Sequence, residues 1–509
     1  MATLGIDLGS SSVKATLLDH DTGRTLGSGQ YPPQEMRIDA PRPGWAEQDP
    51  AAWDDAAQRA VRQALDAADA SAHDVQAVGI AYQMHGLVCL DEDHRPLRPS
   101  IIWCDSRAVE IGEQAFRDLG PERCLSHLLN SPGNFTASKL RWVQQNEPET
   151  FKNVRHFCLP GDYLATQLTG QPSTTVSGLS EGILWDFKDN DTAGWLLEAY
   201  GVDLRLVPER VPTFGQQGEV SGDAASRYGL RPGTPLTYRA GDQPNNALSL
   251  NVRHAGEVAA TAGTSGVVYG VSDQVRYDPQ SRINTFAHVN HRPDDPRLGL
   301  LLCVNGTGIT QSWTRRMLGG SLSYDQLNQL AASAPVGSAG LSVLPFGNGA
   351  ERMLQNRNLG ARLMGADFNR HEPAHLARAA QEGVACAFAH GMGVLRDTGV
   401  DLGVIRAGRA NLFLSPLFRQ TLANLTGTRI ELFETDGAAG AARGAALGAG
   451  LYAEADDAFA SLQRVALIQP QDDELDATRE MFDRWSGHLR AALDDAVAPP
   501  HTANPLSPA

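Results

Sequence analysis

The chain has 509 residues, 42% of them hydrophobic, and a formal net charge of −16. Its length suggests about two to four domains with large hydrophobic cores, and its acidic balance argues against nucleic acid or an anionic membrane as a partner. No stretch approaches the roughly 20 apolar residues that span a bilayer, and no leader pattern opens the chain. With six scattered cysteines and no Cys-x-x-Cys pair, we expect a cytoplasmic globular protein with free thiols.

The first predicted element is a β-hairpin over residues 4–18. Apolar residues lead into Asp7, a small hydroxyl-rich turn follows over residues 9–12, and a second apolar run leaves the turn. Successive backbone N–H groups in such a turn can bind an anion, and Gly9 lets the backbone approach a ligand closely. A carboxylate beside a phosphate is favourable when Mg²⁺ lies between them. The pattern therefore predicts a phosphate-binding hairpin, with an ordinary polar turn as the alternative.

Strand and helix patterns alternate along the next part of the chain. Asp49-Pro50 is a typical helix start, and helical spacing of apolar residues follows over residues 51–70. A short apolar run over residues 75–80 predicts a buried strand, and Gln83 and His85 come shortly after it. Ligands gather at the carboxyl ends of strands in such folds, so we expect both side chains to bind a ligand. A satisfied structural histidine is the alternative for His85.

The opening pattern recurs in the middle of the chain. Residues 258–270 again join two apolar runs through a small turn with glycine and hydroxyl side chains. We interpret this as the second half of an internal duplication, in which two hairpins grip one polyphosphate from both sides. Shortly before it, a strand is expected to end at Gly241, which leaves Asp242 at the mouth of the next helix or loop. Asp242 is our candidate general base, with a helix N-cap as the alternative.

Two later segments, 374–395 and 438–451, have helical spacing and many small residues. Glycine and alanine at the contact positions favour helices that approach one another closely. We expect residues 491–509, which become rich in proline and alanine, to form a disordered tail.

Several segments together resemble the FGGY family of carbohydrate kinases. The resemblance covers nearly the whole chain and rests on the segments Gly5-Ile6-Asp7-Leu8-Gly9-Ser10, Trp45-Ala46-Glu47-Gln48-Asp49-Pro50, Gln83-Met84-His85-Gly86 and Gly263-Thr264-Ser265-Gly266. Within the family, the third segment is similar to the sugar-contacting turn of the xylulokinases. The resemblance implies an α/β fold of two actin-like (ribonuclease H-like, ASKHA) domains around a deep catalytic cleft. An N-terminal FGGY domain over residues 1–251 would mainly bind sugar, and a C-terminal FGGY domain over residues 252–490 would mainly bind ATP.

The resemblance also implies a reaction and its residues. The expected reaction is the phosphorylation of D-xylulose to D-xylulose 5-phosphate with ATP and Mg²⁺, and the assembly we consider is a homodimer. Asp242 would be the catalytic base, and Asp7 would hold Mg²⁺. The expected substrate contacts are Gln83, Met84, His85, Asp242 and Gln243, and the expected ATP contacts are Ser10, Ser11, Ser12, Lys14, Gly263, Thr264, Ser265 and Gly266.

Two places depart from the family pattern. At position 243 the chain has glutamine, where xylulokinases usually have asparagine. Glycerol kinases also have glutamine at this position. Residues 410–415 stand where a glycine-rich adenosine loop is expected, so the adenine contact must be built differently. The alternatives are a kinase for another ketose or polyol (ribulose, glycerol or erythritol), a non-catalytic actin-like ATP-binding protein, and a sugar-sensing regulator without catalysis.

Overall fold

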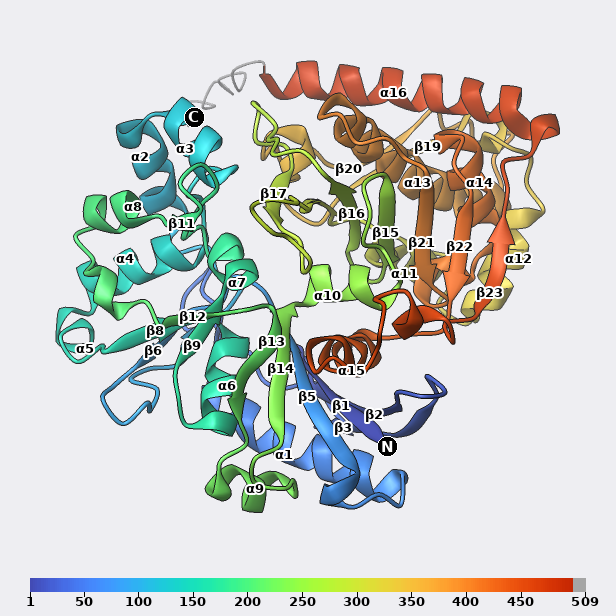
Figure 1. Ribbon diagram of the computed structural model, residues 1–509. Helices are drawn as coiled ribbons and strands as arrows, with labels where there is room; N and C mark the ends of the chain where they lie inside the picture. The colour runs from blue at the N-terminus through green and yellow to red at the C-terminus, as the bar shows by residue number, and fades with distance from the viewer. Residues whose placement is uncertain (498–509) are drawn as a thin grey trace.

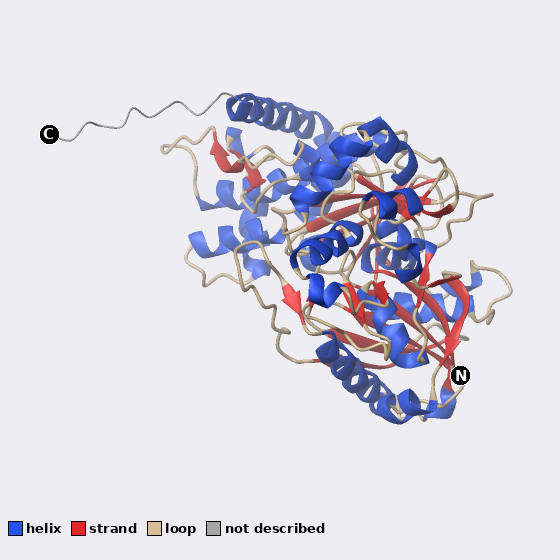
Figure 2. Cartoon of the chain, turned by 90° about the vertical axis from the view of Figure 1, so that its left-hand side faces the viewer, coloured by secondary structure: helices blue, strands red, loops and turns tan. Residues whose placement is uncertain are grey.

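The computed structural model describes residues 1–497, and two β-sheets organise it (Figure 1). One is a six-stranded sheet from the first half of the chain, and the other is a seven-stranded sheet from the second half. In a view turned by 90°, the strands gather in two groups with helices against each of them (Figure 2). The expected α/β architecture with two sheet-rich halves is confirmed.

The six-stranded sheet contains the first predicted hairpin. In sheet order its strands are β13 (Phe214–Glu219), β14 (Pro235–Gly241), β5 (Val75–Tyr82), β1 (Ala2–Leu8), β2 (Val13–Asp19) and β3 (Thr25–Tyr31). β1 pairs antiparallel with β2 and parallel with β5, and β5 pairs parallel with β14. The carboxyl ends of β1, β5 and β14 therefore meet at one edge of the sheet, which brings Asp7, Gln83 and Asp242 to that edge.

The seven-stranded sheet repeats this arrangement. In sheet order its strands are β17 (Asn284–Ala287), β18 (Leu298–Val304), β16 (Gly266–Ser272), β15 (Glu257–Ala262), β21 (Val404–Gly408), β22 (Ile430–Phe433) and β23 (Arg464–Ile468). The hairpin β15–β16 pairs parallel with β21 and antiparallel with β18. The hairpin β1–β2 pairs in the same way with β5 and β3. The topology of the two sheets thus bears out the internal duplication.

Helices and short strand pairs complete the fold. The helices are α1 (Pro50–Ala67), α2 (Val109–Leu119), α3 (Pro121–Leu128), α4 (Thr136–Asn146), α5 (Pro148–Phe151), α6 (Pro160–Thr169), α7 (Val176–Glu181), α8 (Gly194–Ala199), α9 (Gly222–Tyr228), α10 (Asp242–Ser249), α11 (Gly308–Met317), α12 (Tyr324–Ala332), α13 (Pro373–Asp397), α14 (Pro416–Thr426), α15 (Gly437–Gly448) and α16 (Leu475–Val497). The short pairs are β4 (Glu47–Gln48) with β7 (Ser100–Ile101), β6 (Val88–Leu90) with β8 (His156–Cys158), β9 (Ser173–Thr175) with β12 (Glu209–Val211), β10 (Trp185–Asp186) with β11 (Asp191–Thr192), and β19 (Ser342–Phe346) with β20 (Gly360–Met364).

Two helix ends test the sequence-based predictions directly. α1 begins where predicted, because Pro50 is its first residue and the Asp49 carboxylate accepts a hydrogen bond from the Ala51 N–H at 3.0 Å. α16 includes residues 491–497, so this part of the expected tail is helical, whereas residues 498–509 lie outside the described residues. None of the described helices is long and apolar enough to cross a membrane.

Helix α15 belongs to the second half of the chain but packs on the first sheet (Figure 1). It lies so close to β1 and β5 that a Cβ on Gly5 or Gly79 would overlap the carbonyl oxygen of Ala438 or Ala441, respectively. Its small residues therefore serve contact with strands as well as the expected contact with another helix, α10. This packing places the N-terminus of α15 beside the end of β1.

Candidate active site

Asp7 lies near the end of β1, against the N-terminus of α15. A Cβ on Gly437, the first residue of α15, would overlap the Asp7 carboxylate. The pKa of Asp7 is raised to about 6, mainly by burial and then by the negative charge of Asp436. The positive charge of Lys14 acts in the opposite direction. Because Lys14 is exposed, water screens its charge more than that of a buried partner. The Asp7 carboxylate therefore lies in a region of net negative charge.

Asp242 is the first residue of α10 and directly follows β14. Gly241 occupies the N-cap position, so the N-cap alternative for Asp242 is wrong. Burial, and after it the negative charge of Asp7, raise the pKa of Asp242 to about 7. A carboxylate whose pKa is near the working pH is suited to accept a proton as a general base. Gln243 follows it in α10 and, like Asp242, is partly exposed.

Asp7 is coupled electrostatically to two other carboxylates where β1, β14 and α15 meet: Asp436 acts on Asp7, and Asp7 acts on Asp242. Carboxylate oxygens are the ligands that Mg²⁺ takes in phosphoryl-transfer sites, and a divalent cation is a large local charge that would relieve their mutual repulsion. The Asp436 carboxylate caps α15, where it accepts a hydrogen bond from the Ala439 N–H at 2.8 Å. Asp7 is therefore the carboxylate that would hold Mg²⁺, since its pKa responds to Asp436 and its charge acts on Asp242.

The predicted sugar turn contains Gln83, Met84 and His85, and each of them has different surroundings. Gln83 is buried, and its amide donates a hydrogen bond to Gln48 Oε1 at 3.2 Å. Gln48 in turn donates to a carbonyl in the turn of the first hairpin, at 2.7 Å. Met84 packs against Gly241, where an added Cβ would lie 2.6 Å from Met84 Cγ. His85 has a partly exposed side chain (18%), so it is the member of the turn that is open to a ligand.

His85 lies between aromatic rings from both halves of the chain. Its ring centroid is 4.8 Å from that of Phe135 and 5.3 Å from that of Phe286 on β17. Burial, and after it the positive charge of Lys139, lower the pKa of His85 to about 3, so the imidazole is neutral. Arg352 contributes to this lowering and lies 6.0 Å from the Phe135 ring. The sequence analysis missed these four neighbours because no local motif joins their separate segments.

The turn of the first hairpin is closed by a hydrogen bond from the Gly9 N–H to the Ser12 carbonyl at 3.1 Å. Ser10 and Ser12 are partly exposed, while Ser11 and Lys14 are exposed. All four predicted ATP contacts of this hairpin therefore remain accessible to a ligand.

The turn of the second hairpin, over residues 263–266, is joined to the start of α11. The N–H groups of Gly308 and Ile309 donate to the carbonyls of Gly263 and Thr264 at 2.8 and 3.1 Å. Thr264 is exposed, Gly263 and Ser265 are partly exposed, and Gly266 is buried within β16. Three of the four predicted contacts of this turn are thus open to a ligand.

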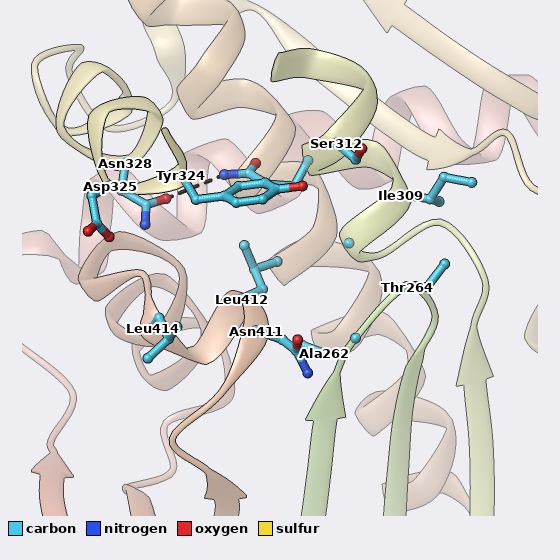
Figure 3. Close-up of a pocket in the computed structure, with 13 residues that line it drawn as sticks. Ala262, Thr264, Ile309, Ser312, Tyr324, Asp325, Asn328, Asn411, Leu412 and Leu414 are labelled. Atoms are coloured by element: carbon cyan, nitrogen blue, oxygen red, sulfur yellow. Dashed lines mark hydrogen bonds between the residues drawn. The ribbon is translucent and has the colours of Figure 1, made fainter. Parts of the chain in front are cut away.

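A cavity of about 450 Å³ lies beside the second turn (Figure 3). Its walls come from the hairpin, α11, α12 and the short helix η5 (Asn411–Leu414), and its lining residues are Ala262, Gly263, Thr264, Gly308, Ile309, Gln311, Ser312, Tyr324, Asp325, Asn328, Asn411, Leu412 and Leu414. In Figure 3 the Tyr324 ring lies above the Leu412 side chain, with Thr264 at the tip of the hairpin. The lining combines apolar side chains such as Leu412 and Leu414 with polar ones such as Gln311 and Asn328, and small-molecule sites likewise combine apolar walls with orienting polar groups. Residues of the glycine-free segment 410–415 therefore line this cavity, as does Tyr324, which no motif had marked.

Comparison with known proteins relates both halves of the chain to the same family. The N-terminal domain of the FGGY family of carbohydrate kinases matches residues 2–249, and the C-terminal domain matches residues 258–453. The xylulose kinase of Escherichia coli (strain K12) is 31% identical over 451 residues, which cover 87% of this chain and 88% of that protein. The xylulose kinase of Klebsiella pneumoniae is 32% identical over 447 residues, with coverage of 87% and 88%.

A solved structure gives the same result for the fold. The crystal structure of xylulose kinase from Rhodospirillum rubrum matches with a TM-score of 0.88 and 25% identity, covering 97% of this chain and 100% of that chain. The expected fold of two actin-like domains is therefore confirmed.

Proposed function

Because the chain belongs to the FGGY family of carbohydrate kinases and is a sugar kinase, we propose that it transfers the γ-phosphoryl group of ATP to D-xylulose and forms D-xylulose 5-phosphate. The observation that carries the choice of sugar is the similarity to xylulose kinases along most of the chain, at 31% identity for the Escherichia coli protein. The Gln83-Met84-His85-Gly86 turn at the end of β5 supports the same choice.

In the proposed mechanism, Asp242 accepts the proton of the sugar hydroxyl while the hydroxyl oxygen attacks the γ-phosphorus of ATP. Phosphoryl transfer needs mainly positioning, charge neutralisation and one proton acceptor, and a pKa of about 7 suits Asp242 to that role. Mg²⁺ held by Asp7 would neutralise charge on the phosphates. His85, held between Phe135 and Phe286, binds sugar hydroxyls at the junction of the two halves.

The proposed nucleotide site combines the two hairpin turns with the cavity beside the second one. The turns occupy equivalent positions in their sheets, which supports a polyphosphate held between them. The cavity beside Thr264 accepts the adenosine, with Tyr324 and Leu412 as apolar walls for the base. This arrangement explains how the chain binds ATP without glycines in residues 410–415.

A coupled assay of ADP release tests the substrate. The purified protein is assayed with D-xylulose, ribulose, glycerol, erythritol and gluconate in turn. D-Xylulose is expected to give the highest kcat/KM. A clear preference for another of these sugars would refute the choice of D-xylulose and leave the kinase assignment intact. An absence of sugar-dependent ADP release would instead favour a non-catalytic actin-like ATP-binding protein.

A further inference from the structure

His85 has an unusual backbone conformation that other residues must maintain. Its φ is +61°, in the left-handed region, which is uncommon for a residue other than glycine. Such conformations persist where the surrounding structure holds them, and they gather at functional sites. His85 therefore requires specific partners for its backbone.

Two buried side chains hold the His85 backbone from opposite sides of the residue. The Glu181 carboxylate, at the end of α7, accepts a hydrogen bond from the His85 N–H at 3.2 Å. The Lys139 ammonium, from α4, donates to the His85 carbonyl at 2.8 Å and to the Ile102 carbonyl at 3.0 Å. Glu181 is 1% exposed and Lys139 is 0% exposed.

Neither side chain has the partner that usually accompanies a buried ionisable group. Among the salt bridges of residues 1–497, Glu181 faces only the neutral His85 ring, and Lys139 takes part in none. Burial raises the pKa of Glu181 well above its usual range and lowers that of Lys139 to about 7. Burying such groups without a salt bridge is unfavourable. The charge of Asp105 offsets part of this cost for Lys139, and the hydrogen bonds to the His85 backbone contribute compensation for both groups.

The backbone of Glu181 also determines which nitrogen of His85 carries the proton. His85 Nδ1 lies 2.9 Å from the Glu181 carbonyl oxygen, and because a carbonyl only accepts, Nδ1 must be the donor. In a neutral imidazole the other nitrogen, Nε2, is then an acceptor. An acceptor can bind a sugar hydroxyl, but it cannot bind the oxygen of a ketone.

We propose that Glu181 and Lys139 are positioning residues of the sugar site, which hold His85 so that Nε2 accepts a hydrogen bond from a hydroxyl of the substrate. The proposal rests on the proposed function only in that a polyhydroxylated sugar binds at this junction. It does not depend on the sugar being xylulose, so the tests use whichever sugar gives the highest kcat/KM in the ADP-release screen.

A double-mutant cycle with Glu181→Ala and His85→Ala tests the coupling. Each single variant should raise the KM for sugar by about tenfold, the effect of losing one buried hydrogen bond, with little change in the KM for ATP. The double variant should be no worse than His85→Ala alone, because Glu181 acts through His85. Effects that multiply in the double variant, or that raise both KM values equally, would overturn the proposal.

Two further variants separate positioning from general stability. Glu181→Gln keeps an oxygen acceptor for the His85 N–H and should return the sugar KM to within about threefold of the unaltered protein. Glu382 is a control for the loss of a buried glutamate. It accepts from the Gly337 N–H at 2.9 Å in the other half and, unlike Glu181, forms a salt bridge with Arg378 at 2.7 Å. Glu382→Ala should lower the melting temperature without changing the sugar KM. A Gln variant as impaired as the Ala variant would contradict the positioning role.

The proton location can be measured on the unaltered protein, which keeps the proposal testable if Glu181→Ala does not fold. Nitrogen NMR of isotope-labelled histidine, with His85→Asn to assign the signal, should report a protonated Nδ1 and an unprotonated Nε2. Sugar added without ATP should shift the Nε2 signal toward the hydrogen-bonded value. A protonated Nε2, or a signal that does not respond to a saturating sugar, would overturn the proposal.

Discussion

Replacing Asp242 by asparagine should stabilise the protein while it removes catalysis. The pKa of Asp242 rises from 3.8 to about 7 in the folded protein, first because of burial and second because of the charge of Asp7. At about 1.4 kcal/mol per pKa unit, keeping Asp242 ionised in the folded state costs up to about 4 kcal/mol. Because Asp242 is partly exposed, solvent screening reduces the gain on replacement to about 1–3 kcal/mol.

The size of this stabilisation depends on pH. Since the folded-state pKa lies above the unfolded-state value, protonated Asp242 stabilises the fold fully below about pH 4, and this contribution is lost as the pH rises through about 7. Asparagine resembles the protonated acid at every pH. The advantage of Asp242→Asn in the free energy of unfolding should therefore grow from about pH 5 to about pH 8.

The assay compares denaturation midpoints of the ligand-free protein without Mg²⁺ at the two pH values, together with turnover. Loss of the general base should lower kcat by about 10²–10⁴-fold. Asp278→Asn is the matched control. Burial alone would raise the pKa of Asp278, but hydrogen bonds from Arg282, one of them at 3.0 Å, have a larger effect and lower the pKa below its usual value. That variant should be less stable at about pH 8. Near-normal turnover of Asp242→Asn, or a loss of stability at about pH 8, would refute the reasoning.

Three further predictions follow from the same site. The kcat/KM for sugar should fall about tenfold per pH unit below about pH 7, because protonated Asp242 cannot accept the hydroxyl proton; a pH–rate profile that stays flat to about pH 5 would contradict this. Asp7→Asn should lower kcat, and a titration with Mg²⁺ should recover part of the loss, whereas Asp242→Asn should not recover; equal responses would exclude Asp7 as the ligand. Leu412→Trp should fill the cavity beside the second hairpin and raise the KM for ATP by about tenfold or more, while an unchanged KM for ATP would place adenosine elsewhere.

Local patterns were sufficient for the elements that the sequence predicted correctly. The Asp7 hairpin and its repeat over residues 258–270 each lie within one continuous segment, so alternating apolar runs and a small turn identify them. The start of α1 at Asp49-Pro50 is likewise a local signal, since capping involves only neighbouring residues. Asp242 could be placed because a strand ends directly before it.

Contacts between distant segments could not be predicted in this way. Glu181 and Lys139 reach His85 across 96 and 54 positions of sequence, and no local pattern marks either of them as a contact of His85. The cavity beside the second hairpin draws its walls from four separate elements, so the sequence showed only that glycines were missing from residues 410–415. The expected tail was predicted from the rise in alanine and proline content. Its first part, residues 491–497, was missed as helix because α16 continues to Val497, where this rise begins.

The position of α15 has a consequence for how the protein can be made and altered. An expressed fragment that ends at residue 251 would lack this helix and would expose the strand surface around Gly5 and Gly79, which only a closely approaching backbone can cover. Such a fragment should aggregate when produced alone and regain solubility when it is co-expressed with the remainder of the chain. For the same reason, swapping whole halves between related kinases would require the β1 and β5 glycines and the alanines of α15 to be exchanged together.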